Sequence, residues 1–349
     1  MKAKILSDFK NTESTLKDCQ NRVFGLIKDL LDNAGIHVHK LESRVKQFDS
    51  LSKKIDEKNK YSSLSEITDI IGIRIIAFLE SDVDQVEVII KSEFEIDEEN
   101  SIDKRQLKSD QFGYRSLHIV AELNEERCSL SEYKKYKEQK FEIQIRSVLQ
   151  HAWAEIEHDL GYKSKASIPE EYRRDFNRLA ALLETADLEF DRLKNSLKEY
   201  EENVSELIRK EPENVPIDQA SLRAFILADP TFEEARNFLR KRWKCIFDHN
   251  ISSLDDFIMR FEFFEVKNIQ QLRNLVESDS KDFLNFVKIF LSDGIDPNLA
   301  FELPIYWFQH FLAAKTMDKD FVDSYRFYGR VKIGGESQDF IDKYKESKK

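Results

Sequence analysis

Four short segments of the chain place acidic, basic and amide side chains where they could bind a charged ligand. The first is FEIQIR (141–146), in which the period of two along a strand puts Glu142, Gln144 and Arg146 on one face and apolar side chains on the other. Three polar side chains on one strand face are costly to bury unless that face lines a wet cleft. The alternative is an edge strand that faces solvent.

A single carboxylate stands at the start of an otherwise apolar segment. Asp69 belongs to ITDIIGIRIIAFL (67–79), where a charge must be paired, must cap the backbone or must bind a metal. Together with Glu142 it would supply the oxygen ligands of Mg²⁺, which often takes one or two carboxylates plus the phosphates of a substrate.

A row of cations is the third feature. Lys46, Ser50 and Lys54 are spaced four residues apart, and Arg44 lies close by. If residues 41–58 form a helix, as their pattern predicts, these side chains share one face. They could hold the phosphates of a nucleotide by charge-assisted hydrogen bonds. Such a row also occurs on plain solvated helix surfaces.

The fourth feature is FGYRSLH (112–118), which leads from a glycine into a strand. Tyr114 could stack on a planar base, and His118 could bond a phosphate or a sugar. Taken alone, a tyrosine after a glycine is also ordinary turn chemistry.

The elements that must position these residues are of mixed type. Helical periodicity covers 10–32, 82–93 and 151–160. β-branched composition at 67–79, and alternation at 116–123 and 140–147, predict strands. We therefore expect the N-terminal part to be an α+β domain, a mixed β-sheet flanked by helices.

The second half of the chain is predicted to be helical. Residues 171–209 carry a heptad-like stripe, which indicates a long helix packed on its own domain or a helical hairpin or oligomer contact; its members are Leu179, Leu183, Ala186, Phe190, Leu193, Leu197, Tyr200, Val204 and Leu207. Two prolines in EPENVP (211–216) predict a boundary between domains 1–210 and 217–349. Most of the 26 phenylalanines follow it, so we expect an all-α C-terminal domain with an aromatic core or a partner-binding surface.

Composition excludes several classes of protein. The 349 residues contain 41% hydrophobic and 35% charged residues but only 9 glycines and 6 prolines, which excludes collagen-like and low-complexity chains. An apolar run of about 18 residues and an apolar signal segment are both lacking, so we expect no membrane partner. Cys19, Cys128 and Cys245 lie far apart, which favours free thiols in a cytoplasmic protein. The net charge of −11 argues against a DNA-coating surface but permits a local basic pocket.

Taken in order, the four segments resemble the synthetase domain of the RelA/SpoT family, the (p)ppGpp or alarmone synthetases, also called GTP pyrophosphokinases. The motifs are R-x-K-x-x-x-S from Arg44, I-x-D-I-I-G-I-R ending at Arg74, G-Y-R-S-L-H ending at His118, and E-I-Q-I-R from Glu142, followed by HAWAEIEHDLGYK. The resemblance covers residues 20–200. The short stretch before Arg44 leaves no room for a His-Asp hydrolase domain, so the chain resembles a short, single-activity member.

The resemblance implies Mg²⁺-dependent transfer of pyrophosphate from ATP to the 3′-hydroxyl of GDP or GTP, with release of AMP, as in the stringent response. It implies that Asp69 and Glu142 are catalytic and hold the metal, and that Glu142 could instead orient the hydroxyl as a base. The implied ATP-binding residues are Arg44, Lys46, Ser50, Lys54 and Arg74. The implied acceptor-binding residues are Lys108, Tyr114, His118, Gln144, Arg146 and His151, the last of which stands where the family often has an asparagine.

One departure from the family pattern keeps the acceptor open. Asp110 lies four residues before Tyr114, where the family usually has a lysine, and the nearest lysine is Lys108. The first alternative is therefore a toxic relative, of a toxin–antitoxin or phage-defence system, that pyrophosphorylates the tRNA 3′ end or makes (p)ppApp. Residues 217–349 would then act as a built-in neutraliser of the toxin, as a sensor or as a docking site for tRNA. They could also bind an antitoxin or another protein ligand. The second alternative is a catalytically silent nucleotide-binding or assembly module. Under any of these functions the chain could form a homo-oligomer.

Overall fold

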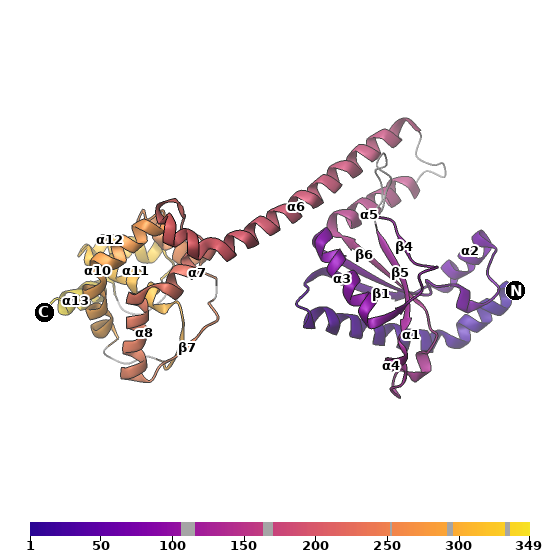
Figure 1. Cartoon of the computed structure of the whole chain (residues 1–349), viewed down its shortest axis with the longest axis horizontal. Coiled ribbons are helices and arrows are strands. Elements are labelled where there is room, and N and C mark those ends of the chain that lie inside the picture. The colour runs from indigo at the N-terminus through magenta and orange to yellow at the C-terminus, as the bar shows by residue number, and fades with distance from the viewer. Residues whose placement is uncertain (106–115, 163–169, 252, 292–295, 332–335) are drawn as a thin grey trace. The chain divides into compact units, whose positions relative to one another are not determined.

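The structure, a computed structural model, describes the whole chain except residues 106–115, 163–169, 252, 292–295 and 332–335 (Figure 1). Contacts between residues divide it into two units, Met1–Asn195 and Ser196–Lys349. The division lies inside the long helix α6 (Glu170–Lys210) rather than after it. The reason is that Val204 and Ile208, near the end of α6, belong to the core of the second unit.

A six-stranded sheet organises the N-terminal unit, with strand order β1-β2-β6-β5-β3 and with β4 paired to β5 (Figure 1). β2 and β6 are parallel, and the other paired strands are antiparallel. The expected strands at 67–79, 116–123 and 140–147 are confirmed as β2, β5 and β6. The strands are β1 (Val38–Val45), β2 (Ile71–Ala77), β3 (Phe94–Ile96), β4 (Ile102–Asp103), β5 (Leu117–Leu123) and β6 (Phe141–Ser147).

The two faces of this sheet differ because side chains alternate along each strand. One face is apolar and is buried with residues of α1 and α3, as Ile75 and Ile145 show. The other face carries Arg74 and Gln144. The helices predicted at 10–32, 82–93 and 151–160 are confirmed, each with a longer extent. The helical elements are α1 (Lys2–Asn33), α2 (Phe48–Lys58), η1 (Leu64–Glu66), α3 (Glu80–Glu93), α4 (Glu125–Cys128), η2 (Lys134–Tyr136) and α5 (Val148–Tyr162).

The predicted helix at 41–58 is wrong in its first part. Residues up to Val45 belong to β1, which pairs with β2 along its whole length, and α2 begins only at Phe48. Lys46 lies between the two elements, and its backbone N–H donates to the Ile70 carbonyl over 2.7 Å. Spacing by four residues suggested a helix, but pairing with a buried neighbouring strand decided the conformation.

The heptad stripe of α6 has two environments. Val204 is buried in the second unit, whereas Phe190, Leu193 and Leu197 are 53–54% exposed. Near the start of α6, contact with the first unit runs through another face, where Ser147 donates to buried Asp187 over 2.7 Å. The stripe is therefore core only toward its C-terminal end.

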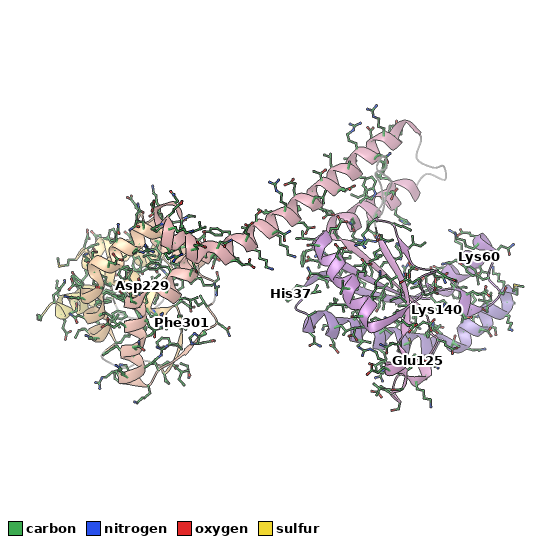
Figure 2. The ribbon with its side chains drawn as sticks, in the orientation of Figure 1. His37, Lys60, Glu125, Lys140, Asp229 and Phe301 are labelled. Carbon is green, nitrogen blue, oxygen red and sulfur yellow. The ribbon has the colours of Figure 1, made fainter. Side chains whose placement is uncertain are left out.

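The described residues of the C-terminal unit are helical, as expected, apart from two three-residue parallel strands. The core of this unit is rich in phenylalanine and also encloses Arg236, whose guanidinium lies 4.0 Å from the centroid of the Phe301 ring. Figure 2 labels Phe301 and Asp229 in this unit. Asp229 caps α8 by accepting from the Thr231 backbone N–H over 2.9 Å. The elements are η3 (Pro212–Asn214), α7 (Gln219–Ala228), α8 (Pro230–Trp243), β7 (Ile246–Asp248), α9 (Asp255–Phe263), α10 (Ile269–Phe290), β8 (Asn298–Ala300), α11 (Leu303–Lys315), α12 (Lys319–Tyr328) and α13 (Ser337–Ser347).

Two sequence-wide expectations concern cysteines and membranes. Cys19, Cys128 and Cys245 are all free and buried, and burial raises the pKa of Cys19 to about 12. None of the helices in the described part of the chain combines the length and the hydropathy that a bilayer span requires.

Candidate active site

Strand register arranges the polar face of the sheet into two rows. In the first row, Arg44 on β1 lies opposite Gly72 on β2, and Gly72 lies opposite Glu142 on β6. Two residues further along the strands comes the second row, whose members are Glu42, Arg74, Gln144 and His118. Because Gly72 has no side chain, the first row has a gap between a cation and a carboxylate.

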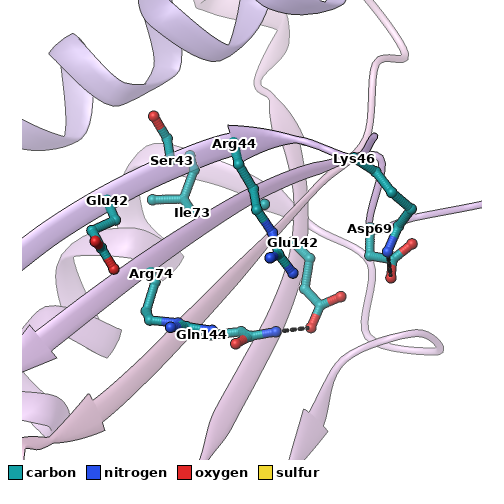
Figure 3. A pocket seen from close by; sticks show the side chains of 10 residues that line it. Glu42, Ser43, Arg44, Lys46, Asp69, Ile73, Arg74, Glu142 and Gln144 are labelled. Atoms are coloured by element: carbon teal, nitrogen blue, oxygen red, sulfur yellow. Dashed lines mark hydrogen bonds and ion pairs between the residues drawn. The ribbon is translucent and has the colours of Figure 1, made fainter. Parts of the chain in front are cut away.

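Apart from His118, the members of these rows line a pocket of about 280 Å³ (Figure 3). Predicted residues from both the ATP side and the metal site contribute to its wall. The lining residues are Glu42, Ser43, Arg44, Lys46, Asp69, Gly72, Ile73, Arg74, Glu142 and Gln144. The structure therefore brings together residues that lie up to about a hundred positions apart in the chain.

Asp69 is the centre of a cationic cluster at one end of the pocket. Its Oδ2 atom lies 2.9 Å from Lys46 Nζ and 2.6 Å from Lys54 Nζ. Burial alone would raise the pKa of Asp69, but the hydrogen bonds from Lys54 and Lys46 outweigh it and lower the pKa below the usual carboxyl value. The two lysines of the predicted row thus converge, although only Lys54 lies on the helix.

At the other end of the pocket, the carboxylate of Glu142 contacts a histidine and an amide side chain. Its Oε1 atom lies 2.6 Å from His118 Nδ1 and accepts from Gln144 Nε2 over 3.1 Å. Burial alone would raise the pKa of Glu142, but these two bonds outweigh it, and the pKa is lowered even though the charge of Asp69 acts in the opposite direction. Both carboxylates are therefore ionised at neutral pH and lie within electrostatic range of each other.

The two carboxylates have the free oxygens that a divalent cation would need. The Oδ1 atom of Asp69 is buried and has no hydrogen-bond partner among the described residues. The two bonds that described residues make to Glu142 both end on Oε1, so Oε2 is not used by them. Among the residues that the structure describes, no cluster of three or more His, Cys, Asp or Glu could hold a metal unaided. An ion here would need the phosphates of a ligand, as Mg²⁺ commonly does.

A cluster around Arg74 borders the pocket on the α5 side. Arg74 Nη1 lies 3.4 Å from Glu155 Oε1, and Glu155 lies 3.8 Å from His151 Nδ1. Burial lowers the pKa of His151, and the charges of Arg74 and Arg146 act in the same direction while Glu155 opposes them. His151 is therefore a neutral side chain near cations, suited to hydrogen bonding with a ligand.

The remaining predicted site residues have different outcomes. Arg146 is buried and does not line the pocket. Its Nε donates to Ser116 Oγ over 3.3 Å, and its Nη2 donates to Gln144 Oε1 over 3.0 Å. Ser50 is exposed on α2 and does not line the pocket. Lys108 and Tyr114 lie outside the described residues.

Sequence reasoning missed Glu42, Ser43 and Gly72 as pocket-lining residues. Glu42 and Arg44 are two residues apart, so reading 38–45 as a strand would have placed both on one face. The signal for Gly72 was weaker. A Cβ built there would lie 3.9 Å from Arg44 Cγ, which is an ordinary contact distance. Packing therefore does not require a glycine at this position, and the space beside it is part of the pocket.

The fold and the site place cations and carboxylates around one pocket on the polar face of a mixed sheet. Residues 43–167 match the family described as "Region found in RelA / SpoT proteins". The N-terminal unit of this chain therefore contains the region that this family model describes, as the sequence resemblance predicts.

Two curated relatives come from Bacillus subtilis (strain 168). GTP pyrophosphokinase YwaC is 28% identical over 192 residues, which are 52% of this chain and 89% of the relative. GTP pyrophosphokinase YjbM is 28% identical over 159 residues, which are 45% of this chain and 72% of the relative. Among solved structures, small alarmone synthetase 1 from Bacillus subtilis is similar with a TM-score of 0.46 and 23% identity, over 55% of this chain and 99% of that one.

Proposed function

We propose that the chain transfers the terminal pyrophosphate of ATP to the 3′-hydroxyl of GDP or GTP, giving (p)ppGpp and AMP. In this reaction the 3′-oxygen forms a bond to the β-phosphorus of ATP and releases the proton of its hydroxyl to water. The bond between that phosphorus and the oxygen bridging to the α-phosphate breaks, and AMP leaves with that oxygen. The observation that carries the proposal is the pocket lined by Arg44, Lys46, Asp69 and Glu142. Lys54 does not line this pocket, but its ammonium group pairs with Asp69 there. The similarity to two GTP pyrophosphokinases supports it.

The charges of the pocket suit a polyphosphate. Phosphoryl transfer asks the protein mainly to align the reactants and to neutralise charge. Arg44 is exposed and forms no ion pair with the described residues, so its guanidinium is free to bind phosphate oxygens. Lys46 and Lys54 share one carboxylate oxygen, and phosphates would offer them further acceptors.

We further propose that Asp69 Oδ1 and Glu142 Oε2 hold Mg²⁺ together with the ATP phosphates. When bound, this ion would withdraw negative charge from the reacting phosphates. A lowered pKa makes Glu142 a weak proton acceptor. We therefore assign to Glu142 the orientation of the hydroxyl and of the metal rather than strong base catalysis.

The acceptor is assigned to the other end of the same face. His118 and Gln144 contact Glu142 there, and Arg146 donates to Gln144. His151 lies near Arg74 and Arg146, and Lys108 and Tyr114 belong to the segment that precedes β5. A guanine nucleotide bound against them would present its 3′-hydroxyl to Glu142. We propose a cytoplasmic setting, because ATP and guanine nucleotides are available there and the three cysteines are free thiols.

The test is product analysis with the full chain. ATP labelled at the γ-phosphate, Mg²⁺ and one acceptor at a time would be incubated: GDP, GTP, an adenine nucleotide or deacylated tRNA. Label on a guanine nucleotide together with stoichiometric AMP supports the proposal. Label on a 3′-pyrophosphorylated adenine nucleotide, separated from the ATP donor, would replace it with (p)ppApp synthesis, and label on tRNA would replace it with a toxin acting on tRNA. If the chain binds nucleotide but forms AMP with none of the acceptors, it is a catalytically silent module. Glu142→Gln and a chelator serve as controls, and both should abolish AMP formation.

A further inference from the structure

Arg105 forms an ion-pair cluster beside the candidate acceptor side. Its guanidinium lies 2.6 Å from Asp84 Oδ1 and 2.5 Å from Glu87 Oε2, both on α3, and 3.0 Å from Asp103 Oδ2 on β4. Its Nε also donates to Asp103 Oδ1 over 3.0 Å. The side chain is only 11% exposed. The N–H groups of this guanidinium thus bond to three carboxylates and are not available to bind the phosphate of an acceptor nucleotide.

β4 depends on this cluster because the strand itself is so short. Only Ile102 and Asp103 pair with β5, opposite His118 and Leu117. Isolated pairing of two residues is weak, since short strands need tertiary support. Burial alone would raise the pKa of Asp103, but the side-chain and backbone bonds of Arg105 outweigh it and lower the pKa. Arg105 therefore ties β4 to α3 through charged, geometrically specific bonds.

A continuous set of hydrogen bonds runs from this strand to the pocket. The backbone N–H of Lys104 donates to the Ser116 carbonyl over 3.0 Å. Ser116 Oγ accepts from Arg146, which donates to Gln144, which donates to Glu142. The pairing of β4 with β5 reaches Glu142 by a second route, because His118 contacts Glu142 directly.

We propose that Arg105 is a positioning residue for the acceptor side: by clamping β4 to α3 it holds β5, and with it His118 and the Gln144–Glu142 pair, in place. The clamp is a property of the fold, while its effect on an acceptor nucleotide rests on the proposed function. ATP phosphates are assigned to the Arg44 and Lys46 side, so the clamp acts on one substrate and not on the other.

The experiment compares Arg105→Ala and Arg105→Lys with a matched control, Arg127→Ala. Arg127 also forms an ion pair with α3, at Glu93, but it lies on α4 and has no link to β4. For Arg105→Ala we expect the KM for GDP to rise about tenfold and the KM for ATP to stay within about twofold, since a partly buried charge network couples over short range. Arg105→Lys should restore part of the effect, and Asp84→Asn with Glu87→Gln should mimic it without adding to Arg105→Ala.

Two results would overturn the proposal: equal rises of both KM values, or an unchanged KM for GDP in a folded Arg105→Ala protein. If the wild-type chain forms no AMP with any acceptor, the proposed function fails and the clamp is tested separately by hydrogen exchange. Faster exchange at residues 102–105 and 116–118 in Arg105→Ala, but not in Arg127→Ala, would support the clamp, and equal exchange in both would refute it.

Discussion

Replacing Asp69 by asparagine removes one charge from the pocket and almost nothing from its shape. In the wild-type protein the carboxylate accepts from Lys46 over 2.9 Å and from Lys54 over 2.6 Å. The amide leaves two cations, 15% and 25% exposed, facing each other without a counter-ion. It also removes the buried Oδ1 charge that we assign to a metal.

The size of each effect follows from this geometry. Hydrogen bonds to charged groups contribute about 1.5–3 kcal/mol each before solvent screening, so a loss of about 1–3 kcal/mol in unfolding free energy is expected for the N-terminal unit. Loss of a metal ligand and its electrostatic stabilisation raises a barrier by about 3–4 kcal/mol, which corresponds to a fall in kcat of roughly 10²–10³-fold.

The assay measures AMP formation and thermal unfolding of Asp69→Asn beside Asp279→Asn. Asp279 is a matched control because its side chain is 8% exposed and both its oxygens accept from Lys315 over 2.7 Å, but it belongs to the C-terminal unit. Asp279→Asn should lose stability and keep its activity. If Asp69→Asn keeps more than a tenth of wild-type kcat while losing stability, the reasoning about catalysis is refuted.

The same variant has a pH signature. Because the folded-state pKa of Asp69 is lowered, its stabilising contribution is complete above the unfolded carboxyl pKa of about 3.9 and is lost as the pH falls through the folded value. The stability difference between wild type and Asp69→Asn should therefore narrow below about pH 4. A constant difference down to pH 3 would contradict the ion-paired state.

Three further predictions concern other parts of the chain. Gly72→Val should change unfolding free energy by less than about 1 kcal/mol, since a strand accepts valine, yet raise the KM for ATP at least about tenfold by filling the pocket floor; an unchanged KM would exclude Gly72 from the ATP site. Burial lowers the pKa of His310 to about 3, so from pH 7 to pH 5 the C-terminal unit should lose about 2 kcal/mol as the unfolded chain takes up the proton, and denaturant titrations of His310→Gln should show a shallower pH dependence. Leu193→Glu with Leu197→Glu should alter stability by less than about 0.5 kcal/mol because both side chains are 54% exposed, and should convert an oligomer to a monomer in sedimentation; a monomeric wild type would end the oligomer hypothesis.

Element types could be predicted well where the periodicity was strong. Alternation in FEIQIR placed Glu142, Gln144 and Arg146 on one face, and the structure agrees. The stretch at 41–45 was assigned to a helix because Lys46, Ser50 and Lys54, which follow it, fit helical spacing, whereas the stretch pairs with β2 in the sheet. Local patterns therefore predicted most element types correctly. They gave the wrong type for the one segment whose conformation depends on pairing with a neighbouring strand.

What the sequence by itself determined is the set of chemical groups and their order: the two carboxylates, the cations and the family that the motifs resemble. What only the tertiary structure decided is which of them meet. Register across β1, β2 and β6 is set by pairing between distant segments, and it alone puts Arg44 opposite Gly72 and Glu142. The capture of Asp69 by two lysines and of Arg105 by three carboxylates likewise depends on elements brought together by the buried apolar face, which no local spacing encodes.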